Sequence, residues 1–459
     1  MISGLATERI VAACIAITLY VALCAAIGVM QWRRGQQALR DAAALMPAAP
    51  GTANWLITYA SQTGNAEQLA WQTARLLHTA GMPAHILPLG QLQLADLQGA
   101  ERALFIASTC GEGDPPDNAS LFARNALATA APLQQLHYGL LALGDRTYQN
   151  FCGFGRALDQ WLQAQGAQPL FARIEVDNGQ QDALHEWQHR LSHIAGTSDL
   201  PDWQAPAYER WQLVARRHLN PGSAGNPCFH LELAPEAGIA LPHWESGDLL
   251  QVLPPADRQR PREYSIASIP DDGHVHLLVR QEHRSDSTLG VASGWLTEDA
   301  SIGETIEVRL RSHGNFRLGE NATRPMILIG NGTGLAGLRS HLKARAAQGQ
   351  YRNWLIFGER NAAHDFYYRE ELLAWQQQGM LARADWVFSR DQPQREYVQD
   401  RLRSHAEAVR EWLADGAAIY VCGSLEGMAG GVEAALTDIV GAKGVEQLIE
   451  SGRYRRDVY

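Results

Sequence analysis

The chain has 459 residues, of which 46% are apolar and 19% are charged, and its formal net charge is −10. This composition allows sizeable hydrophobic cores and excludes a globally disordered chain. The acidic balance argues against a nucleic-acid-binding protein and allows an acidic face for a basic partner. The length predicts about three domains.

The cysteines indicate the redox compartment. Six are present, with no CxxC pair and no Cys/His spacing typical of zinc or an iron–sulfur cluster. We therefore predict no metal site. Because the cysteines form no disulfide framework, a reducing compartment is expected.

The first element in chain order is an apolar segment at residues 10–30 that contains no charge. About 20 such residues span a bilayer as a helix. Trp32, Arg33 and Arg34 follow, so the positive-inside rule predicts that the C-terminal bulk faces the cytoplasm. A cleaved signal peptide is the alternative, although the segment is long for one and its n-region is weakly basic. The sequence thus predicts a single-pass inner-membrane protein, with a tether at residues 31–53.

The rest of the chain divides into three predicted domains. Over residues 54–195, strand-like runs alternate with helical patterns, which predicts an α/β domain with an open parallel sheet. Residues 196–207 are a predicted linker. Short alternating strands over residues 208–321 predict a small antiparallel β-barrel. The β-α rhythm returns over residues 322–459 and predicts a second α/β domain.

Three loops of the first α/β domain are typical of a site for a phosphate and a flat ring. SQTGNAE, from Ser61, joins a strand to a helix, where free N–H groups and the helix dipole favour a phosphate. An ordinary N-cap is the alternative. STCGEGDPPDN, from Ser108, and LGDRTYQNFCGFG, from Leu143, both follow strands, and ligands bind at such strand ends in open α/β sheets. The ring of Tyr148 is suited to stacking.

In this order, the three loops resemble the flavodoxin-like FMN domain of diflavin reductases. Cys110 departs from the pattern, because reductases of the microsomal cytochrome type have a second tyrosine there. Sulfite reductase flavoproteins also lack an aromatic residue at that position. A reactive thiol and a neutral packing role are both open for Cys110. The resemblance implies FMN binding by Ser61, Gln62, Thr63, Gly64, Asn65, Ala66, Ser108, Thr109, Cys110, Gly111, Glu112, Gly113, Asp114, Leu143, Gly144, Tyr148, Asn150, Phe151 and Asp177.

The barrel segment contains REYSIAS, at residues 262–268, and LGVASGWL, at residues 289–296. Together they resemble the FAD-binding signature of ferredoxin–NADP reductases. The resemblance implies that Arg262 and the turn at residues 290–293 hold the pyrophosphate, that Tyr264 stacks on the ring and that Ser265 lies by its reactive edge. The implied FAD-binding residues are Arg262, Glu263, Tyr264, Ser265, Leu277, Leu278, Val279, Gly290, Val291, Ala292, Ser293 and Tyr459.

The last domain begins with MILIGNGTGLAGLRSHL, a strand, a glycine-rich turn and a helix, which predicts a dinucleotide-type turn. The family form has Pro where Asn331 stands and Pro-Phe at residues 337–338. Further on, FSRDQPQREYVQ offers two arginines, whose planar guanidinium groups suit a 2′-phosphate. A solvated basic loop is the alternative. The resemblance implies NADPH binding by Gly332, Thr333, Gly334, Ser389, Arg390, Arg395, Tyr397, Gln399 and Cys422.

The chain ends on RYRRDVY, which is similar to the C-terminus of sulfite reductase flavoproteins. In that family the terminal aromatic residue covers the FAD ring until nicotinamide displaces it, and the acid two residues earlier helps to position hydride transfer. The resemblance therefore implies a transfer site of Ser265, Cys422, Asp457 and Tyr459. A strand residue that packs on its own domain is the alternative for Tyr459.

One part of the family pattern is missing. Diflavin reductases usually insert a helical connecting domain into the barrel segment, but only residues 208–262 separate the linker from REYSIAS here. The insert is therefore absent or minimal, and electron transfer between the flavins is the step that this departure affects.

The resemblance implies an NADPH–haemoprotein reductase that passes electrons from NADPH to FAD to FMN, and the apolar segment at residues 10–30 predicts that it is anchored in a membrane. A haem protein or a similar one-electron acceptor then receives the electrons. A sulfite reductase flavoprotein component and a ferric or quinone reductase are the alternatives. A redox sensor with slow turnover is a further possibility of a different class.

Overall fold

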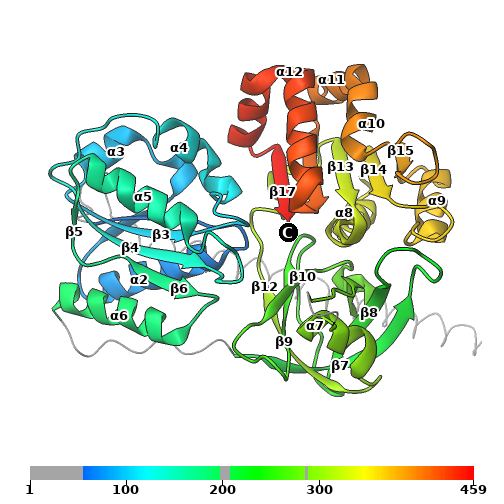
Figure 1. The fold of residues 1–459 in the computed structure, drawn as a ribbon, viewed down its shortest axis with the longest axis horizontal. Coiled ribbons are helices and arrows are strands. Elements are labelled where there is room, and N and C mark those ends of the chain that lie inside the picture. Colours follow the sequence, from blue (N-terminus) through cyan, green and yellow to red (C-terminus); the bar gives the residue numbers. More distant parts are fainter. Residues whose placement is uncertain (1–54, 197–206, 285–287) are drawn as a thin grey trace, which may run out of the picture.

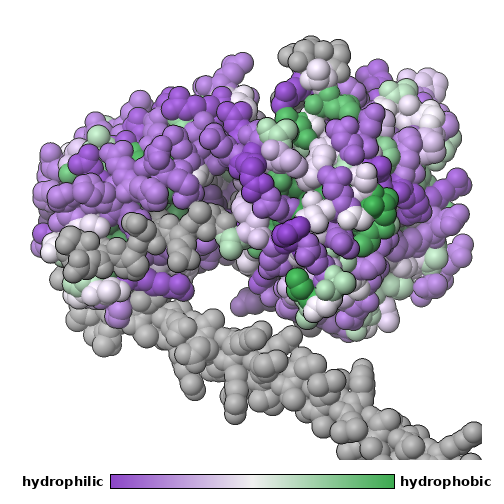
Figure 2. All heavy atoms as spheres, turned by 90° about the horizontal axis from the view of Figure 1, so that it is seen from below, coloured by the Kyte–Doolittle hydropathy of each residue, from purple (hydrophilic) through white to green (hydrophobic). Residues whose placement is uncertain are grey.

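The structure is a computed structural model that describes residues 55–196, 207–284 and 288–459. Two α/β domains and a β-barrel follow one another along the chain. In Figure 1 the first α/β domain lies to the left, and the barrel lies below the last domain on the right. Seen from below, the first domain is mainly hydrophilic, and hydrophobic side chains form small groups over the other part of the molecule (Figure 2).

The first domain is a parallel sheet covered on both faces by helices. Its strand order, β2-β1-β3-β4-β5 with β6 beside β4, is that of the flavodoxin-like fold. The strands are β1 (Trp55–Ala60), β2 (Ala84–Pro88), β3 (Arg102–Ser108), β4 (His137–Gly144), β5 (Gln168–Pro169) and β6 (Ile174–Asp177). The helices are α2 (Asn65–Thr79), α3 (Leu94–Gly99), α4 (Ser120–Asn125), α5 (Gly153–Ala164) and α6 (Gln181–Ala195).

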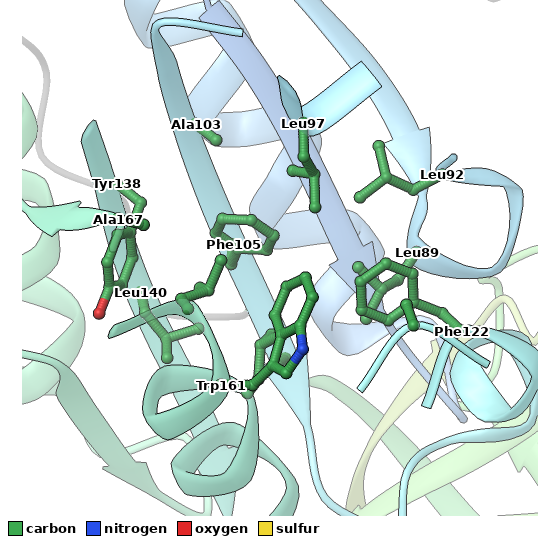
Figure 3. Packing of buried hydrophobic residues seen from close by; sticks show 14 of the residues in the cluster. Leu89, Leu92, Leu97, Ala103, Phe105, Phe122, Tyr138, Leu140, Trp161 and Ala167 are labelled. Atoms are coloured by element: carbon green, nitrogen blue, oxygen red, sulfur yellow. The ribbon is translucent and has the colours of Figure 1, made fainter. Parts of the chain in front are cut away.

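Aromatic side chains hold the helices of this domain on the sheet. Helices α2 and α6 pack on one face, and α3, α4 and α5 on the other (Figure 1). Trp161 and Phe122 meet edge to face, with ring centroids 5.9 Å apart, over Phe105 of β3 (Figure 3). Burial of one large apolar side chain contributes about 1.5–3 kcal/mol. This packing keeps the strand ends, and the loops that leave them, in a defined place.

The middle domain is an antiparallel barrel with strand order β10-β9-β12-β7-β8-β11. A bridge between Ile266 and Leu277 joins the two ends of this order, so the sheet closes. Residues 207–265 contain no helix, so no helical connecting block stands there. The strands are β7 (Glu209–His218), β8 (Cys228–Pro235), β9 (Leu249–Leu253), β10 (Arg262–Ser265), β11 (Val275–Arg280) and β12 (Thr305–Arg311), and α7 spans Val291–Gly294.

The last domain is a parallel five-stranded sheet of order β15-β14-β13-β16-β17. Its edge strand, β17, is the C-terminal segment, and it ends close to the barrel in Figure 1. The strands are β13 (Met326–Asn331), β14 (Asn353–Glu359), β15 (Arg383–Phe388), β16 (Ala418–Gly423) and β17 (Tyr454–Val458). The helices are α8 (Leu335–Ala347), α9 (Arg369–Gln377), α10 (Val398–Ser404), α11 (Ala406–Ala414) and α12 (Gly430–Glu450).

The predicted fold class needs one correction. The flavodoxin-like domain, the barrel and the second α/β domain are present, but no helix among the described residues is long and apolar enough to cross a membrane. The predicted transmembrane segment, residues 10–30, and the predicted tether, residues 31–53, lie outside the described residues, as does most of the predicted linker. The described residues thus contain no membrane span, and the predicted single-pass inner-membrane location is corrected accordingly.

Candidate functional site

Residues 61–65 join β1 to α2 and form the turn predicted to hold the FMN phosphate. Gly64 has a φ of 81°, and a side chain there would come within 2.9 Å of the Ser312 carbonyl of the barrel. The Ser61 hydroxyl is buried and has no hydrogen-bond partner among the described residues. A buried polar atom without a partner is costly. The turn therefore fits a group that supplies oxygen acceptors, such as a phosphate.

The same turn is a contact between the first domain and the barrel. The Asn315 side-chain amide donates to the Ser61 and Gln62 carbonyls, at 2.6 and 3.2 Å. The Arg311 guanidinium donates to the Thr63 carbonyl at 3.3 Å. Backbone carbonyls of the predicted phosphate turn thus bind side chains of another domain.

Residues 108–114 form a tight turn after β3, at the same edge of the sheet. The Cys110 N–H donates to the Asp114 carbonyl at 2.8 Å, and the Asp114 N–H donates to the Cys110 carbonyl at 2.9 Å. Gly113 has a φ of 115°, which only glycine adopts readily. The Thr109 hydroxyl is buried without a partner in the described structure, like that of Ser61. A second orphaned hydroxyl therefore lies on a loop of the same site.

Residues 143–151 follow β4 and bind the preceding turn. The Asn150 side-chain amide donates to the Glu112 carbonyl at 2.7 Å. Asp177, at the end of β6, accepts a backbone N–H of this loop at 3.0 Å. The ring of Tyr148 is 44% exposed, so it has a free face for stacking. The three loops thus lie at the same edge of the sheet. Of the other predicted residues, Asn65 and Ala66 open α2, Ser108 ends β3, Gly111 lies in the second turn, Leu143 and Gly144 end β4, and Phe151 is buried.

The surroundings of Cys110 favour a packing role for it. Its thiol lies 3.7 Å from the Gln62 side-chain oxygen. Burial, with a smaller contribution from the Asp117 carboxylate, raises the pKa of the Cys110 thiol above its ordinary value. A protonated thiol is a poor nucleophile, so the reactive alternative is disfavoured.

Strand β10 holds the predicted FAD residues at the closure of the barrel. Arg262 donates to the Arg260 carbonyl at 2.6 Å, and its side chain is 39% exposed. Tyr264 lies two residues on, so both side chains are on one face of the strand. Glu263, on the other face, accepts a hydrogen bond from Gln251 at 3.3 Å. The two predicted ligand groups thus share a face.

The predicted pyrophosphate turn at residues 290–293 opens α7. The Gly290 N–H donates to the Glu282 carbonyl at 2.7 Å, and the Ser293 hydroxyl accepts the Glu282 N–H at 3.1 Å. These hydrogen bonds to Glu282 therefore fix the conformation of the turn. Residues 277–279, also predicted to contact FAD, are buried in β11.

Ser265, Cys422 and Asp457 come together at the junction of the barrel and the last domain. The Ser265 hydroxyl donates to Asp457 Oδ2 at 2.6 Å, although 192 positions separate the two residues. The Cys422 Sγ donates to the same oxygen at 3.6 Å. Asp457 lies in register with Cys422 on neighbouring strands β17 and β16. Pairing of the C-terminal strand thus places the carboxylate between two donors, and it brings together three of the residues that the resemblance implied.

Cys422 is a neutral donor in this group. Burial, and then the Asp457 carboxylate, raise the pKa of the Cys422 thiol well above its ordinary value. The thiol therefore stays protonated at neutral pH and can donate to the carboxylate. The site combines one carboxylate with a hydroxyl and a thiol, all three buried.

Tyr459 has an anchored backbone and an exposed ring. Its N–H donates to the Gly423 carbonyl and its carbonyl accepts the Leu425 N–H, both at 3.0 Å. Its hydroxyl donates to Thr333 Oγ1 at 3.2 Å, yet the residue is 56% exposed. Chain ends are usually frayed unless tied down. This geometry suits a ring that covers a neighbouring group.

The glycine-rich turn of the last domain packs against the carbonyl of Cys422. A side chain at Gly334 would lie 2.0 Å from that oxygen, which leaves room only for glycine. Gly332 has a φ of 55°, and a side chain there would meet the Arg280 guanidinium at 2.8 Å. Arg280 also forms an ion pair with Glu359. A dinucleotide pyrophosphate fits beside such a turn, and Arg280 supplies a cation there.

The predicted 2′-phosphate residues lie around the end of β15. Ser389 is buried, with its N–H bound at 2.9 Å to the carbonyl that ends β14. Arg390 and Arg395 are exposed, and neither forms an ion pair with any described residue. Tyr397 is 42% exposed and precedes α10, and Gln399 lies in the first turn of that helix. Two unpaired guanidinium groups fit a doubly charged phosphate.

The departure at Asn331 has a structural role. Its side-chain oxygen accepts the Ser424 N–H at 3.0 Å, which ties the end of β13 to the segment after β16. The departure at Gly337 leaves a position where a side chain would come within 3.0 Å of the Phe316 ring. Both changes are therefore accommodated by packing around the turn.

Sequence reasoning missed the cations that join the domains. Arg456, next to the predicted Asp457, donates to the Asp117 carboxylate of the first domain at 3.0 Å. It also donates to Glu433 at 2.8 Å. Arg280 was missed as well. A basic residue at a strand end is too common a pattern to reveal either role without the fold.

Known protein families match two of the three domains. Residues 57–187 match the family described as flavodoxin, and residues 328–434 match the oxidoreductase NAD-binding domain. The sulfite reductase [NADPH] flavoprotein alpha-component of Neisseria meningitidis serogroup B is 28% identical and aligns over 93% of each chain. The Vibrio cholerae protein of that name is also 28% identical, over 88% of this chain and 87% of its own. The Aliivibrio fischeri protein of that name is 27% identical, over 94% of this chain and 93% of its own.

The relatives are longer within the matched region. The alignment to the Neisseria protein has 563 positions, which exceeds the 459 residues of this chain. The relatives therefore contain segments with no counterpart here. This agrees with the lack of a helix in residues 207–265.

Proposed function

We propose that this chain, which belongs to the diflavin reductase family, is the electron-supplying flavoprotein of a two-component reductase whose other component is a haem protein. It is an NADPH-dependent oxidoreductase whose cofactors are FMN and FAD. The relatives that align with this chain over most of their length are named sulfite reductase [NADPH] flavoprotein alpha-component. That name favours sulfite reduction by the partner over the other acceptors considered from the sequence.

The observation that carries the proposal is the convergence of Ser265, Cys422 and Asp457 beside Tyr459. FAD, when bound, accepts a hydride from NADPH and passes electrons singly to FMN. The chain contributes binding, orientation and charge. All four residues were predicted from the resemblance, and their proximity in the structure supports their assignment to the hydride-transfer site.

The Asp457 carboxylate supplies negative charge at this site. A nicotinamide ring gains positive charge as it loses a hydride, and a buried carboxylate stabilises that charge. Ser265 and Cys422 donate to the carboxylate and fix its orientation. The Tyr459 ring, exposed on an anchored backbone, is suited to cover the flavin until the nicotinamide displaces it.

Coenzyme selection is assigned to Arg390 and Arg395. Both guanidinium groups are exposed without an ion-pair partner in the part of the chain that the structure describes. NADH lacks the 2′-phosphate that they would bind, so NADPH is preferred.

Direct contacts between domains take over the part usually played by a connecting domain. Asn315 and Arg311 bind the FMN phosphate turn, and Arg456 binds Asp117. These bonds hold the FMN loops on the side of the molecule that carries the FAD strand. Electron transfer between the flavins is proposed to occur in this docked arrangement.

The first test uses the purified full chain. Released flavins are quantified, and the flavin spectrum is followed during anaerobic addition of NADPH and, separately, NADH. One FMN and one FAD per chain, both reduced by NADPH far faster than by NADH, is the expected result. Flavins that bind but are not reduced by NADPH would point instead to a redox sensor.

The second test identifies the acceptor. The haem-containing component of a bacterial sulfite reductase is added, and NADPH oxidation is measured with and without sulfite. Oxidation that depends on both sulfite and the added component is expected. Rapid reduction of cytochrome c without any sulfite-dependent oxidation would favour a different haem-protein acceptor. Rapid reduction of quinone or ferric complexes alone would favour the small-molecule alternatives.

A further inference from the structure

Two neighbouring barrel strands carry nitrogen and oxygen atoms that are close enough to bind one metal ion. His230 and Glu232 alternate along β8, and His276 of β11 pairs in register with Glu232. Their side chains share one face of the sheet, and their ligand atoms all lie within 4.8 Å of one another. None of the three residues is among the predicted flavin or coenzyme ligands, although His276 directly precedes Leu277 on β11.

The distances suit a small divalent ion. His230 Nε2 lies 3.2 Å from Glu232 Oε1, and His276 Nε2 lies 4.0 Å from Glu232 Oε2. Zinc binds nitrogen and oxygen at about 2.0–2.2 Å, so two ligands of a tetrahedral ion lie about 3.3–3.6 Å apart. The first distance matches this separation closely, and the second needs only a small side-chain rotation.

Neighbouring groups orient the three side chains. The Tyr368 hydroxyl lies 2.9 Å from His230 Nδ1, and as an acceptor there it leaves the Nε2 lone pair directed towards Glu232. His274 Nδ1 lies 2.8 Å from Glu232 Oε2 and holds the carboxylate from the outside. A histidine ligand whose second nitrogen is bound, and a carboxylate with an outer partner, are usual features of metal sites.

One nearby cation has to be accommodated. Arg339 Nη1 lies 3.3 Å from His276 Nδ1. Its charge is balanced by Glu371, which accepts two of its N–H groups at 2.7 and 2.8 Å. Its stronger bond from Nη1 goes to the Ala267 carbonyl at 2.5 Å. Metal binding moves the His276 proton to Nδ1, so the longer contact is lost while the other bonds of Arg339 remain.

From this geometry we propose that His230, Glu232 and His276 bind a transition-metal ion of the zinc class. Two imidazoles and one carboxylate select zinc, cobalt or nickel over magnesium and calcium, which prefer all-oxygen sites. The ion joins β8 to β11 and, through Tyr368 and the segment around Arg339, links the barrel to the last domain. Its role is structural, because the hydride-transfer residues do not contact it.

The test is a titration of the full flavin-loaded chain, without an affinity tag, after treatment with a chelator. Zn²⁺ binding is measured by calorimetry, and zinc X-ray absorption reports its ligands. We expect one ion per chain with two imidazole ligands, and a rise in melting temperature on saturation. No saturable binding by the wild-type chain, or a spectrum without imidazole, would overturn the proposal.

Variants locate the site. Glu232→Gln and His276→Gln are each expected to weaken zinc binding at least about 100-fold, whereas His274→Gln, which removes only an outer partner, weakens it about tenfold. Flavin content and the metal-free melting temperature show whether each variant is folded. Unchanged affinity in folded Glu232→Gln would contradict the assignment. If neither ligand variant folds, the test rests on the folded His274→Gln chain, because an unchanged zinc affinity of that chain would also contradict the assignment.

A second histidine pair provides the matched control. His189 and His193 are exposed on α6, and their Nε2 atoms are 3.2 Å apart. Such a pair can bind zinc weakly on any helix surface. The double variant His189→Gln/His193→Gln is expected to keep the proposed site intact. Loss of the single strong site in this variant would show that the barrel cluster is not the zinc site.

Discussion

The predicted FMN loops and the proposed hydride-transfer site are built in different ways. Each FMN loop continues its own strand, and the three strands lie in one sheet. The transfer site instead takes Ser265 from the barrel and Cys422, Asp457 and Tyr459 from the last domain. A locally built site depends on the fold of one domain, whereas a site at a junction depends on how two domains pack.

The largest effect is expected at the junction. Asp457→Asn keeps the size of the side chain but removes the buried negative charge, so NADPH should reduce the FAD about 100-fold more slowly. Anaerobic stopped-flow measurement of flavin reduction checks this. Asp438→Asn is the control, because that carboxylate is exposed and, among the described residues, forms an ion pair only with Arg403, at 2.9 Å. Equal rates in the two variants would remove Asp457 from the site.

Gly64→Ala tests the locally built site. Alanine at a φ of 81° is strained and would also press on the Ser312 carbonyl. We expect FMN affinity to fall at least about tenfold while FAD content is kept, as measured from released flavins. Gly81→Ala is the matched control, since Gly81 has a φ of 74° but nothing lies within 4 Å. Similar FMN loss in both variants would mean that backbone strain, not the contact, is responsible.

Arg456→Gln tests the contact between the first domain and the last domain, and it alters none of the residues assigned to the FMN loops or to the hydride-transfer site. It removes the charge that binds both Asp117 and Glu433, so FMN reduction by FAD should slow about tenfold while FAD reduction by NADPH is little affected. Because Arg456 and Asp117 are only 19% and 24% exposed, salt screens this pair in part and should slow the wild type by less than the substitution does.

The control for this variant is Arg124→Gln, which removes only a looser contact to Glu433 at 3.8 Å. The same slowing in the control would contradict a specific role for Arg456. An undisturbed FMN reduction rate in Arg456→Gln would show that this ion pair does not hold the docked arrangement.

Arg390→Ala tests coenzyme selection at a site that needs no domain contact. Loss of one charged hydrogen-bond partner should raise the KM for NADPH about tenfold and leave the KM for NADH unchanged. Steady-state kinetics with both coenzymes measure this. Arg403→Ala, at another exposed arginine with its own carboxylate partner, should change neither value. An equal rise in both KM values would place Arg390 outside the 2′-phosphate site.

The smallest effect concerns pH and the interior of the last domain. Burial lowers the pKa of His341 to about 3, with Arg345 as a further cause. Below about pH 6.5, His341 binds a proton in the unfolded chain but not in the folded chain. The free energy of unfolding therefore falls as the pH drops from there towards 3. Melting temperatures between pH 7.5 and 5 should fall less steeply in His341→Gln than in the exposed control His137→Gln. An identical slope would contradict this role.

Several features were predictable because their signal is local. The FMN loops, the glycine-rich turn and the terminal Asp457 and Tyr459 each combine a short motif with a strand end, and backbone geometry places such residues at one edge of a sheet. The absence of a helical insert was predictable in the same way, from the short segment before Arg262.

Other features left no local signal. Asn315 and Arg311 bind carbonyl groups of the FMN turn, and any polar side chain can do so if packing brings it near. The cluster of His230, Glu232 and His276 leaves no sequence signal, because the cysteine and histidine spacings typical of zinc sites are those of loops and helices. The pattern His-x-His at residues 274–276 indicates a set of ligand atoms only when β8 lies beside it. The predicted membrane span, residues 10–30, lies outside the described residues, among which no helix is long and apolar enough to cross a membrane.

By itself, the sequence indicated the α/β and β units, and it predicted the strand ends and the motifs that are assigned to the flavins and the coenzyme. These follow from periodicity and from backbone requirements that act within a few residues. Only the tertiary structure decided that Asp457 receives the Ser265 and Cys422 donors, that Arg456 joins the first domain to the last, and that three barrel side chains face one another. The physical reason is that such contacts depend on strand register and on the packing of one domain against another, which no short stretch of the chain specifies.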